Sequence, residues 1–119
     1  MKMKETGSMR FKDHIENGVC IVEGIGHISP EEIQDTKVHL KELMGQDGLR
    51  GLVFDCGKTR FLASEVIGLL VALQKKADEI GKKFVLCNLA NADQETLKIA
   101  RLDRFFKVDM DLDEAKAAI

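Results

Sequence analysis

The sequence predicts an α/β protein with a mixed β-sheet of about four to five strands and helices mainly on one side. Three observations lead to this prediction. An Asn17-Gly18 pair between two apolar segments indicates a β-hairpin near the start of the chain. Short runs rich in Val, Ile, Leu and Phe then alternate with longer amphipathic segments, which is typical of parallel strands joined by helices. The 119 residues have the length of one domain.

The hairpin is expected to consist of residues 9–16 and 19–23. The second of these segments is rich in β-branched residues, which favour strands. Asn17 and Gly18 both tolerate the positive φ that a type I′ turn requires. We expect residues 1–8 to form a flexible leader and residues 9–119 to form a single domain.

Two longer helices are expected after the hairpin. Ser29-Pro30 predicts the start of the first, because Ser caps helices and Pro is favoured at the first helical position, and this helix extends to about residue 45. A short buried strand follows at Gly51–Asp55. The second helix is expected to begin at Ser64 and to end at Gly81, which is a suitable C-terminal cap.

The remaining expected elements are shorter. They are a buried strand at residues 84–87, a helix at 92–101, a final strand at 105–108 and a terminal helix at 112–119. The predicted order is therefore β-β-α-β-α-β-α-β-α. The strands after the first helix have nearly continuous apolar sequences, as expected for strands covered by helices.

Charge and hydropathy exclude two classes of protein. Eighteen Lys and Arg residues stand against twenty Asp and Glu, and the net charge of −2 provides no overall basic field for nucleic acid. The longest apolar runs are about five residues, whereas a membrane helix needs about 20. We expect a cytoplasmic protein with no membrane insertion and no nucleic-acid partner.

The three cysteines lie far apart in apolar segments, and their spacing matches no metal motif. We therefore expect Cys20, Cys56 and Cys87 to be reduced and mostly buried. The three histidines form no ligand pair with them, so no metal is expected. No cofactor is expected either.

Two weaker patterns point to other chemistry. Gly24-Ile25-Gly26 resembles part of a dinucleotide-binding loop, but the third glycine is missing and a lone G-x-G is weak support. Asp55 and Cys56 lie at the carboxyl end of a predicted strand, where α/β enzymes place reactive groups. No third residue completes a recognisable catalytic set with them, so we expect the protein not to be an enzyme.

Residues 55–70 resemble the central signature of STAS domains, the fold shared by anti-sigma factor antagonists and the tails of sulphate transporters. Asp55 matches the aspartate that ends a strand in that family, and Phe61 matches a loop phenylalanine. Ser64 falls on the first serine of the family's Asp-Ser-Ser-Gly-Leu-Gly motif, and Gly68 lies in the following turn of helix.

Two further segments resemble the same family. Residues 26–29 are similar to its Gly-Glu-Leu-Asp segment, and residues 102–108 are similar to its closing Gly-Leu-Asp-Lys-Leu-Phe segment. The resemblance covers roughly residues 9–119, and the order of the predicted elements agrees with the family.

The resemblance implies a regulatory protein–protein interaction domain similar to an anti-sigma factor antagonist. The implied switch is phosphorylation of Ser64, and the implied partner is an anti-sigma factor that is also a serine kinase. The implied partner-binding residues are Ser29, His27, Ala63, Glu65, Ile67 and Gly68. The sequence leaves open whether the protein is a monomer or a weak dimer.

Several alternatives stay open. The acidic residues expected in the family are replaced by His27, Ser29 and Ala63. The loss of acids at Ala63 and Ser29 favours a non-switching STAS component of a signalling or transport-linked complex. A small nucleotide-binding protein is the less favoured alternative. Ser64 also suits a helix N-cap. The apolar Ile67 belongs either to a partner surface or to a stripe buried under a neighbouring helix.

The loop before Ser64 carries three polar residues whose role is also open. Lys58, Thr59 and Arg60 can pair with a phosphate on the serine, or they can form an ordinary solvated surface loop.

Overall fold

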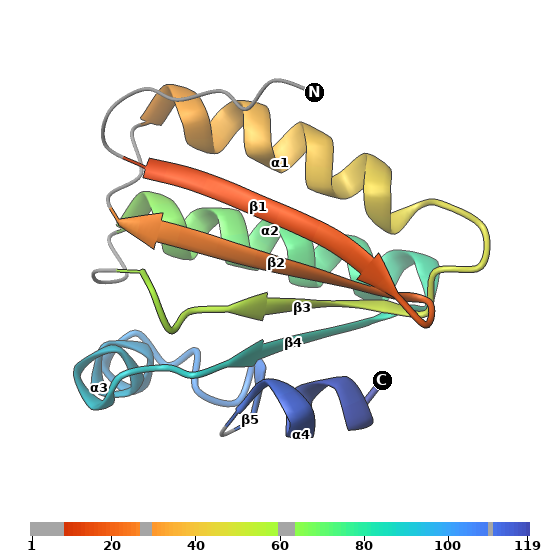
Figure 1. Ribbon diagram of the computed structural model, residues 1–119. Coiled ribbons are helices and arrows are strands. Elements are labelled where there is room, and N and C mark those ends of the chain that lie inside the picture. The colour runs from red at the N-terminus through yellow and green to blue at the C-terminus, as the bar shows by residue number, and fades with distance from the viewer. Residues whose placement is uncertain (1–8, 27–29, 60–63, 110) are drawn as a thin grey trace.

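A computed structural model describes residues 9–26, 30–59, 64–109 and 111–119. In these ranges a five-stranded sheet is covered by helices on both faces (Figure 1). The predicted leader, residues 1–8, lies outside the described ranges.

The elements occur in the predicted order. They are β1 (Met9–Glu16), β2 (Val19–Gly26), α1 (Pro30–Met44), β3 (Gly51–Asp55), α2 (Ser64–Ile80), β4 (Lys83–Cys87), α3 (Asn91–Ile99), β5 (Lys107–Asp109) and α4 (Leu112–Ala117). The strands lie in the sheet in sequence order, with β1 and β2 antiparallel and every later pair parallel. The predicted mixed α/β sheet is confirmed.

The hairpin has the predicted two-residue turn. Asn17 and Gly18 have φ values of 53° and 78°, as a type I′ turn requires, and Glu16 pairs with Val19 across it. The Arg50 backbone N–H donates to the Gly18 carbonyl at 2.7 Å, and the Arg50 guanidinium donates to the Asn17 carbonyl at 2.7 Å. The turn is therefore attached to the start of β3.

Successive side chains of the central strands enter two different cores, because side chains alternate across a sheet. The even-numbered strand residues belong to the larger core, and they are Cys20, Val22, Leu52, Phe54, Phe84 and Leu86. The odd-numbered ones belong to the smaller core, and they are Val19, Ile21, Val53, Val85 and Cys87. A register slip of one residue would exchange the two sets, so the burial of both faces specifies the register.

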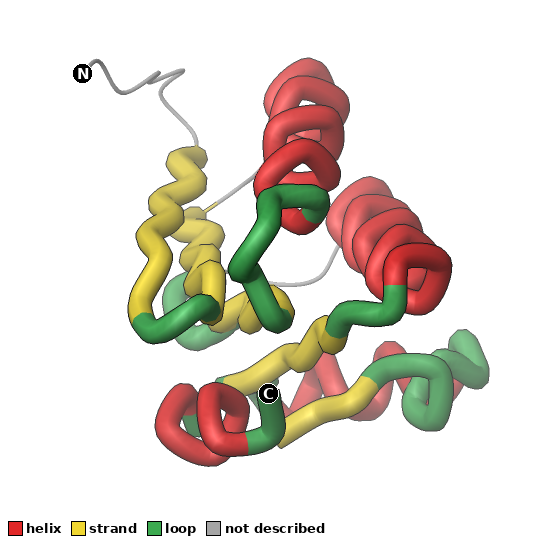
Figure 2. Tube along the Cα trace, turned by 90° about the vertical axis from the view of Figure 1, so that its right-hand side faces the viewer, coloured by secondary structure: helices red, strands yellow, loops and turns green. Residues whose placement is uncertain are grey.

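The larger core lies under α1, α2 and α3. Leu40 of α1, Leu70 of α2 and Leu97 of α3 are all almost fully buried in it. Figure 2 shows α1 and α2 side by side on one face of the sheet, and α4 on the opposite face. The prediction of helices mainly on one side is confirmed.

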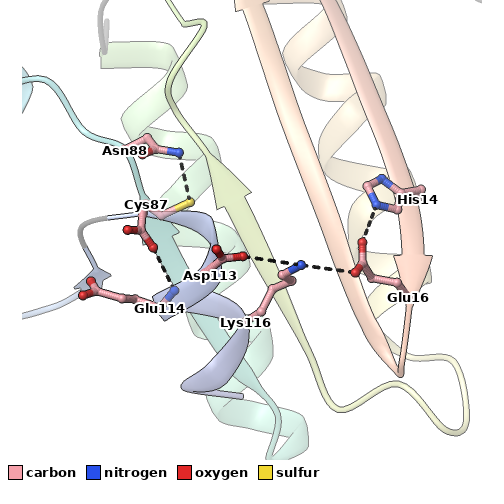
Figure 3. Close-up of polar contacts among 8 residues, drawn as sticks. His14, Glu16, Cys87, Asn88, Asp113, Glu114 and Lys116 are labelled. Atoms are coloured by element: carbon pink, nitrogen blue, oxygen red, sulfur yellow. Dashed lines mark hydrogen bonds and ion pairs between the residues drawn. The ribbon is translucent and has the colours of Figure 1, made fainter.

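The short helix α4 closes the smaller core with Ala115 and is attached to β1 through Lys116 (Figure 3). The ammonium of Lys116 lies 3.2 Å from Glu16 and 3.9 Å from Asp113. His14 lies 3.0 Å from the other Glu16 oxygen. The His14 hydrogen bond, followed by Lys116, lowers the pKa of the Glu16 carboxyl below its usual value.

The ends of the longer helices follow from their sequences. The first described residue of α1 is Pro30, as predicted for the first helical position, whereas its expected cap Ser29 lies outside the described residues. Gly81 follows α2 with a φ of 73°, and the Lys82 N–H donates to the Ala77 carbonyl at 2.9 Å. This is the Schellman arrangement, so the predicted glycine cap is confirmed.

The final strand differs from its prediction. β5 is Lys107–Asp109, whereas Phe105 and Phe106 lie in the preceding turns. The N–H groups of both phenylalanines are bonded to the Leu102 carbonyl, and the Phe106 ring is buried at 6.4 Å from the Phe84 ring. The aromatic pair was mistaken for strand sequence because its role in ring packing depends on Phe84, which is distant in the chain.

The close approach of β3 and β4 predicts a large effect for Gly51→Ala. A Cβ at this position would lie 2.6 Å from the Lys83 carbonyl oxygen and 2.9 Å from the Ile119 side chain. We expect a loss of about 2 kcal/mol or more in urea unfolding, since overpacking against backbone requires a shift of the strands. Gly45→Ala is the control, because its Cβ would make only ordinary contacts of 3.6 Å or longer. Equal stability of the two variants would contradict this account.

Candidate functional site

The candidate site lies at the edge of the sheet where parallel strands end. Since β2, β3 and β4 run in the same direction, their carboxyl ends meet at this edge, and α1, α2 and α3 each follow one of them (Figure 1, left). Open α/β sheets commonly place functional groups at such an edge. The predicted serine region therefore lies where the topology brings three strand ends together.

Asp55, at the end of β3, connects this strand to the end of β4. Asp55 is only 8% exposed, and its Oδ1 accepts hydrogen bonds from the Gly57 N–H and the Asn88 amide, both at 2.9 Å. Asn88 has a φ of 58°, a conformation that Asn tolerates better than most residues. The family's strand-end aspartate thus orients the loop that leads toward α2.

The same loop is attached to the end of β2 by Thr59. Its hydroxyl donates to the Gly24 carbonyl at 2.8 Å, while the Lys58 ammonium lies 3.6 Å from the Glu23 carboxylate. Both side chains therefore contribute to holding the loop, which favours the structural interpretation of Lys58 and Thr59 over phosphate binding. Arg60 lies outside the described residues.

Ser64 is exposed and is the first residue of α2. The predicted position at a helix N-terminus is confirmed. N–H groups in the first turn of a helix lack intrahelical partners, and the helix dipole is positive there. A negative group on the serine would meet a favourable local field.

The proposed partner-binding residues are only partly described. Glu65 and Gly68 are exposed, and a Cβ added at Gly68 would meet nothing within 4 Å. Ile67 is half-buried and packs against the larger core, as does Val71, which supports the burial alternative for this flank of α2. His27, Ser29 and Ala63 lie outside the described residues.

Sequence reasoning did not identify the role of Asn88. Its position directly after a predicted buried strand, and the tolerance of Asn for positive φ, were the available signals. The Gly24 carbonyl was also missed, because Gly24 was considered only as part of a dinucleotide loop. In the structure Gly24 lies within β2 and pairs with Phe11, so residues 24–26 are strand.

The three thiols are free and buried, as predicted. Burial is the main reason that the pKa of Cys20 rises to about 11 and that of Cys87 to about 12. Burial likewise raises the pKa of the Cys56 thiol, with smaller contributions from Cys87 and Asp55. Such thiols are poor nucleophiles, so the Asp55-Cys56 pair lacks the activated thiolate that catalysis would need.

Two other kinds of feature are absent from the described residues. They contain no group of three His, Cys, Asp or Glu side chains arranged to hold a metal ion. None of the helices in this part of the chain has the length and apolar content required to span a bilayer.

The chain belongs to the STAS domain family, because the model of that family matches residues 10–115. This match covers the hairpin, the three strand ends and Ser64, and it confirms the resemblance found in the sequence.

Solved structures with the same fold include several anti-sigma factor antagonists. The antagonist from Mycobacterium paratuberculosis is 22% identical over 94% of each chain, with a TM-score of 0.80. A serine-to-glutamate variant of RsbS from Moorella thermoacetica is 21% identical over 87% of this chain and 89% of that chain, with a TM-score of 0.78. The phosphorylated form of SpoIIAA from Bacillus is 9% identical over 92% of this chain and 99% of that chain, with a TM-score of 0.72. These likenesses show an anti-sigma factor antagonist-like STAS fold.

The hydrogen bonds of Asp55 predict that Asp55→Ala destabilises the protein by about 2–3 kcal/mol. The change leaves the Gly57 N–H and the Asn88 amide without their acceptor in a part-buried place. Urea unfolding measures the loss. Asp55→Asn is the matched control, since it keeps one acceptor oxygen and should lose less stability. A change below about 0.5 kcal/mol in Asp55→Ala would count against this role.

The buried thiols predict slow labelling of native protein by a thiol reagent. At pH 8 a thiol with the pKa of Cys20 is ionised in about one molecule in a thousand. We expect almost no reaction in the folded protein and rapid reaction of all three thiols in urea, measured by absorbance. Fast labelling of the folded protein would show that the thiols are accessible.

The same pKa shifts predict the sign of a pH dependence. Unfolded thiols lose their protons near pH 8.5, whereas the native thiols of Cys20 and Cys87 keep theirs to about pH 11 and 12. The native state therefore binds more protons in this window, and stability falls as the pH rises through it. Cys87→Ala should reduce the slope of unfolding free energy between pH 8 and 10.

Proposed function

We propose that this protein is a regulatory protein–protein interaction domain of the anti-sigma factor antagonist type, switched by phosphorylation of Ser64. The observation that carries the proposal is the exposed position of Ser64 as the first residue of α2. Asp55 and Thr59 hold the part of the preceding loop that the structure describes, residues 55–59, against the ends of β2 and β4.

The local chemistry supports Ser64 over two other hydroxyl groups. Thr59 donates its hydroxyl to the Gly24 carbonyl, and Thr96 donates to the Ala92 carbonyl within α3. A phosphate on Ser64 would lie at a helix N-terminus, where unpaired N–H groups and the dipole favour an anion. It would also add about −1.5 to −2 charges to the surrounding surface.

The added charge gives a physical mechanism for the switch. The unmodified surface around Ser64, Glu65 and Gly68 binds the partner, and the phosphate weakens this contact by repulsion and by the cost of desolvating it. The fold remains intact, because Ser64 is exposed and belongs to neither core of the described residues. His27, Ser29 and Ala63 are proposed as further parts of the surface, together with the partly exposed edge of Ile67.

The partner in this proposal is an anti-sigma factor with serine kinase activity. In this proposal the kinase binds the ATP, so the chain itself acts without a cofactor and is not an enzyme. Two structural neighbours support a serine switch in this fold, since one is a serine-to-glutamate variant of RsbS and another is phosphorylated SpoIIAA. A cytoplasmic location follows from the proposed partner.

A non-switching STAS component is the second candidate. Glu65 is exposed directly beside Ser64 and places a permanent negative charge at the start of α2. The acidic residue that normally precedes the switch serine is replaced by Ala63. Both features hinder transfer of an anionic phosphoryl group, so a scaffold in a larger signalling or transport-linked complex would use the same surface without the switch.

The proposal predicts slow, specific phosphorylation of Ser64 by anti-sigma factor kinases of the source organism. Ser64→Ala should abolish incorporation of phosphate, and Ala63→Asp should accelerate it by about one to two decades, because each improved polar contact lowers the barrier by about 1–3 kcal/mol. Radiolabelled ATP measures the rate, and mass spectrometry maps the modified residue. Thr96→Ala is the control and should behave as the wild type.

The outcomes separate the two candidates. Phosphate on Thr96 with Ser64 unmodified would refute the assignment. Tight binding to such a kinase without any incorporation would favour the non-switching component. Gly68→Ala tests partner binding separately from modification. It retains Ser64 and adds only a methyl group to the exposed surface.

A further inference from the structure

A cleft of about 510 Å³ lies at the end of the sheet opposite Ser64. It is bordered by the second half of α2, by the start of β4 and by the turn that leads into β5. This end of the molecule faces the viewer in Figure 2, where β4 and β5 run side by side. The volume is within the range of about 300–1,000 Å³ that is typical of small-molecule sites.

The lining of the cleft is strongly basic. Four cations contribute to it, and they are Lys82, Lys83, Arg104 and Lys107. Asp78 is the single carboxylate among the lining residues, although the whole chain has a net charge of −2. Positive charge is therefore concentrated in this cleft, although the net charge of the protein is negative. A concave basic surface attracts anions.

The four cations are not equally available. The Lys82 ammonium donates to the Met44 carbonyl at 2.6 Å and to the Gln46 carbonyl at 2.7 Å, so it links α1 to β4. The Lys107 ammonium lies 3.5 Å from Asp109. Within the described ranges, no ion pair or hydrogen bond engages the exposed side chains of Lys83 and Arg104. These two charges remain for a ligand.

An aromatic ring completes the rim. Phe105 is 36% exposed, and its ring contacts the buried Phe106 ring at 5.0 Å in an edge-to-face arrangement. Phe106 in turn contacts Phe84, so the exposed ring of Phe105 belongs to a cluster of three packed rings. Phe105 therefore offers an apolar surface in the same cleft as Lys83 and Arg104, the two cations without a partner among the described residues.

We propose that this cleft binds a small organic dianion that carries an aromatic ring or a similar flat apolar group. The guanidinium of Arg104 suits one carboxylate or phosphate, which it can bind through two parallel N–H groups. Lys83 supplies a second point charge, and Phe105 packs against the flat part of the ligand. This inference goes beyond the proposed function, because the cleft and Ser64 lie at opposite ends of α2 and a bound ligand leaves the serine uncovered.

A titration of isotope-labelled full-length protein with phthalate tests the proposal by NMR. Phthalate combines two carboxylates with a benzene ring. Its size predicts a dissociation constant of about 1 mM from the usual binding energy per atom. We expect saturable shifts of the backbone amides of Lys83 and of residues 104–107. Inorganic phosphate, which lacks the ring, and benzyl alcohol, which lacks the charge, should each bind about tenfold more weakly or worse.

Matched variants locate the site. Arg104→Gln should weaken phthalate binding by about tenfold or more, since it removes a charged hydrogen-bonding group. Arg101→Gln is the control, because Arg101 is an exposed cation three residues away that does not line the cleft. The amide spectrum shows whether each variant stays folded.

Three results would overturn the proposal. Equal weakening by Arg104→Gln and Arg101→Gln would mean a general charge effect. Shifts spread over lysines of the whole surface without saturation would mean no site. Inorganic phosphate binding as tightly as phthalate would show that the ring makes no contribution and would remove the proposed ligand class.

Discussion

The burial of β3 on both faces is the constraint on which the rest of the structure depends. All five residues of Gly51–Asp55 are buried, because α1 and α2 cover one face of the strand and α4 covers the other. A strand in this position can shift neither its register nor its direction without exposing one of two cores. The burial of β3 therefore also fixes the position of its carboxyl end at Asp55.

A few polar contacts connect the carboxyl end of β3 to the neighbouring strands and loops. Asp55 connects the loop after β3 to Asn88 at the end of β4, and Thr59 connects the same loop to Gly24 in β2. Residues 55–59 are thus held from two sides, and Ser64 is exposed as the first residue of α2. In the proposed switch, the exposed hydroxyl of Ser64 is accessible to a kinase, and positioning of the phosphoryl group supplies much of the catalysis in such transfers.

The two ends of α2 differ in chemistry. Its first turn presents Ser64 and Glu65 at the positive end of the helix dipole, whereas the second half borders a cleft with Lys83 and Arg104. The cations near the C-terminal end complement the helix dipole. Among the described residues, the side chains of Lys83 and Arg104 have no ion-pair partner, and the partly exposed Phe105 lines the same cleft. The helix therefore separates the proposed partner surface from the proposed anion cleft.

Local sequence determined most of the fold and the position of the serine. Asn17-Gly18 specifies its turn because both residues tolerate positive φ. Pro30 starts a helix because its φ is preset. Gly81 ends a helix because it also tolerates positive φ. The pattern around Ser64 was sufficient to place it at the start of α2. Only the tertiary structure decided the limits of β5, the role of Asn88 and the existence of the basic cleft. Each of these depends on contacts between segments distant in the chain, such as Phe106 with Phe84 and Asn88 with Asp55, and local preferences carry no information about such contacts.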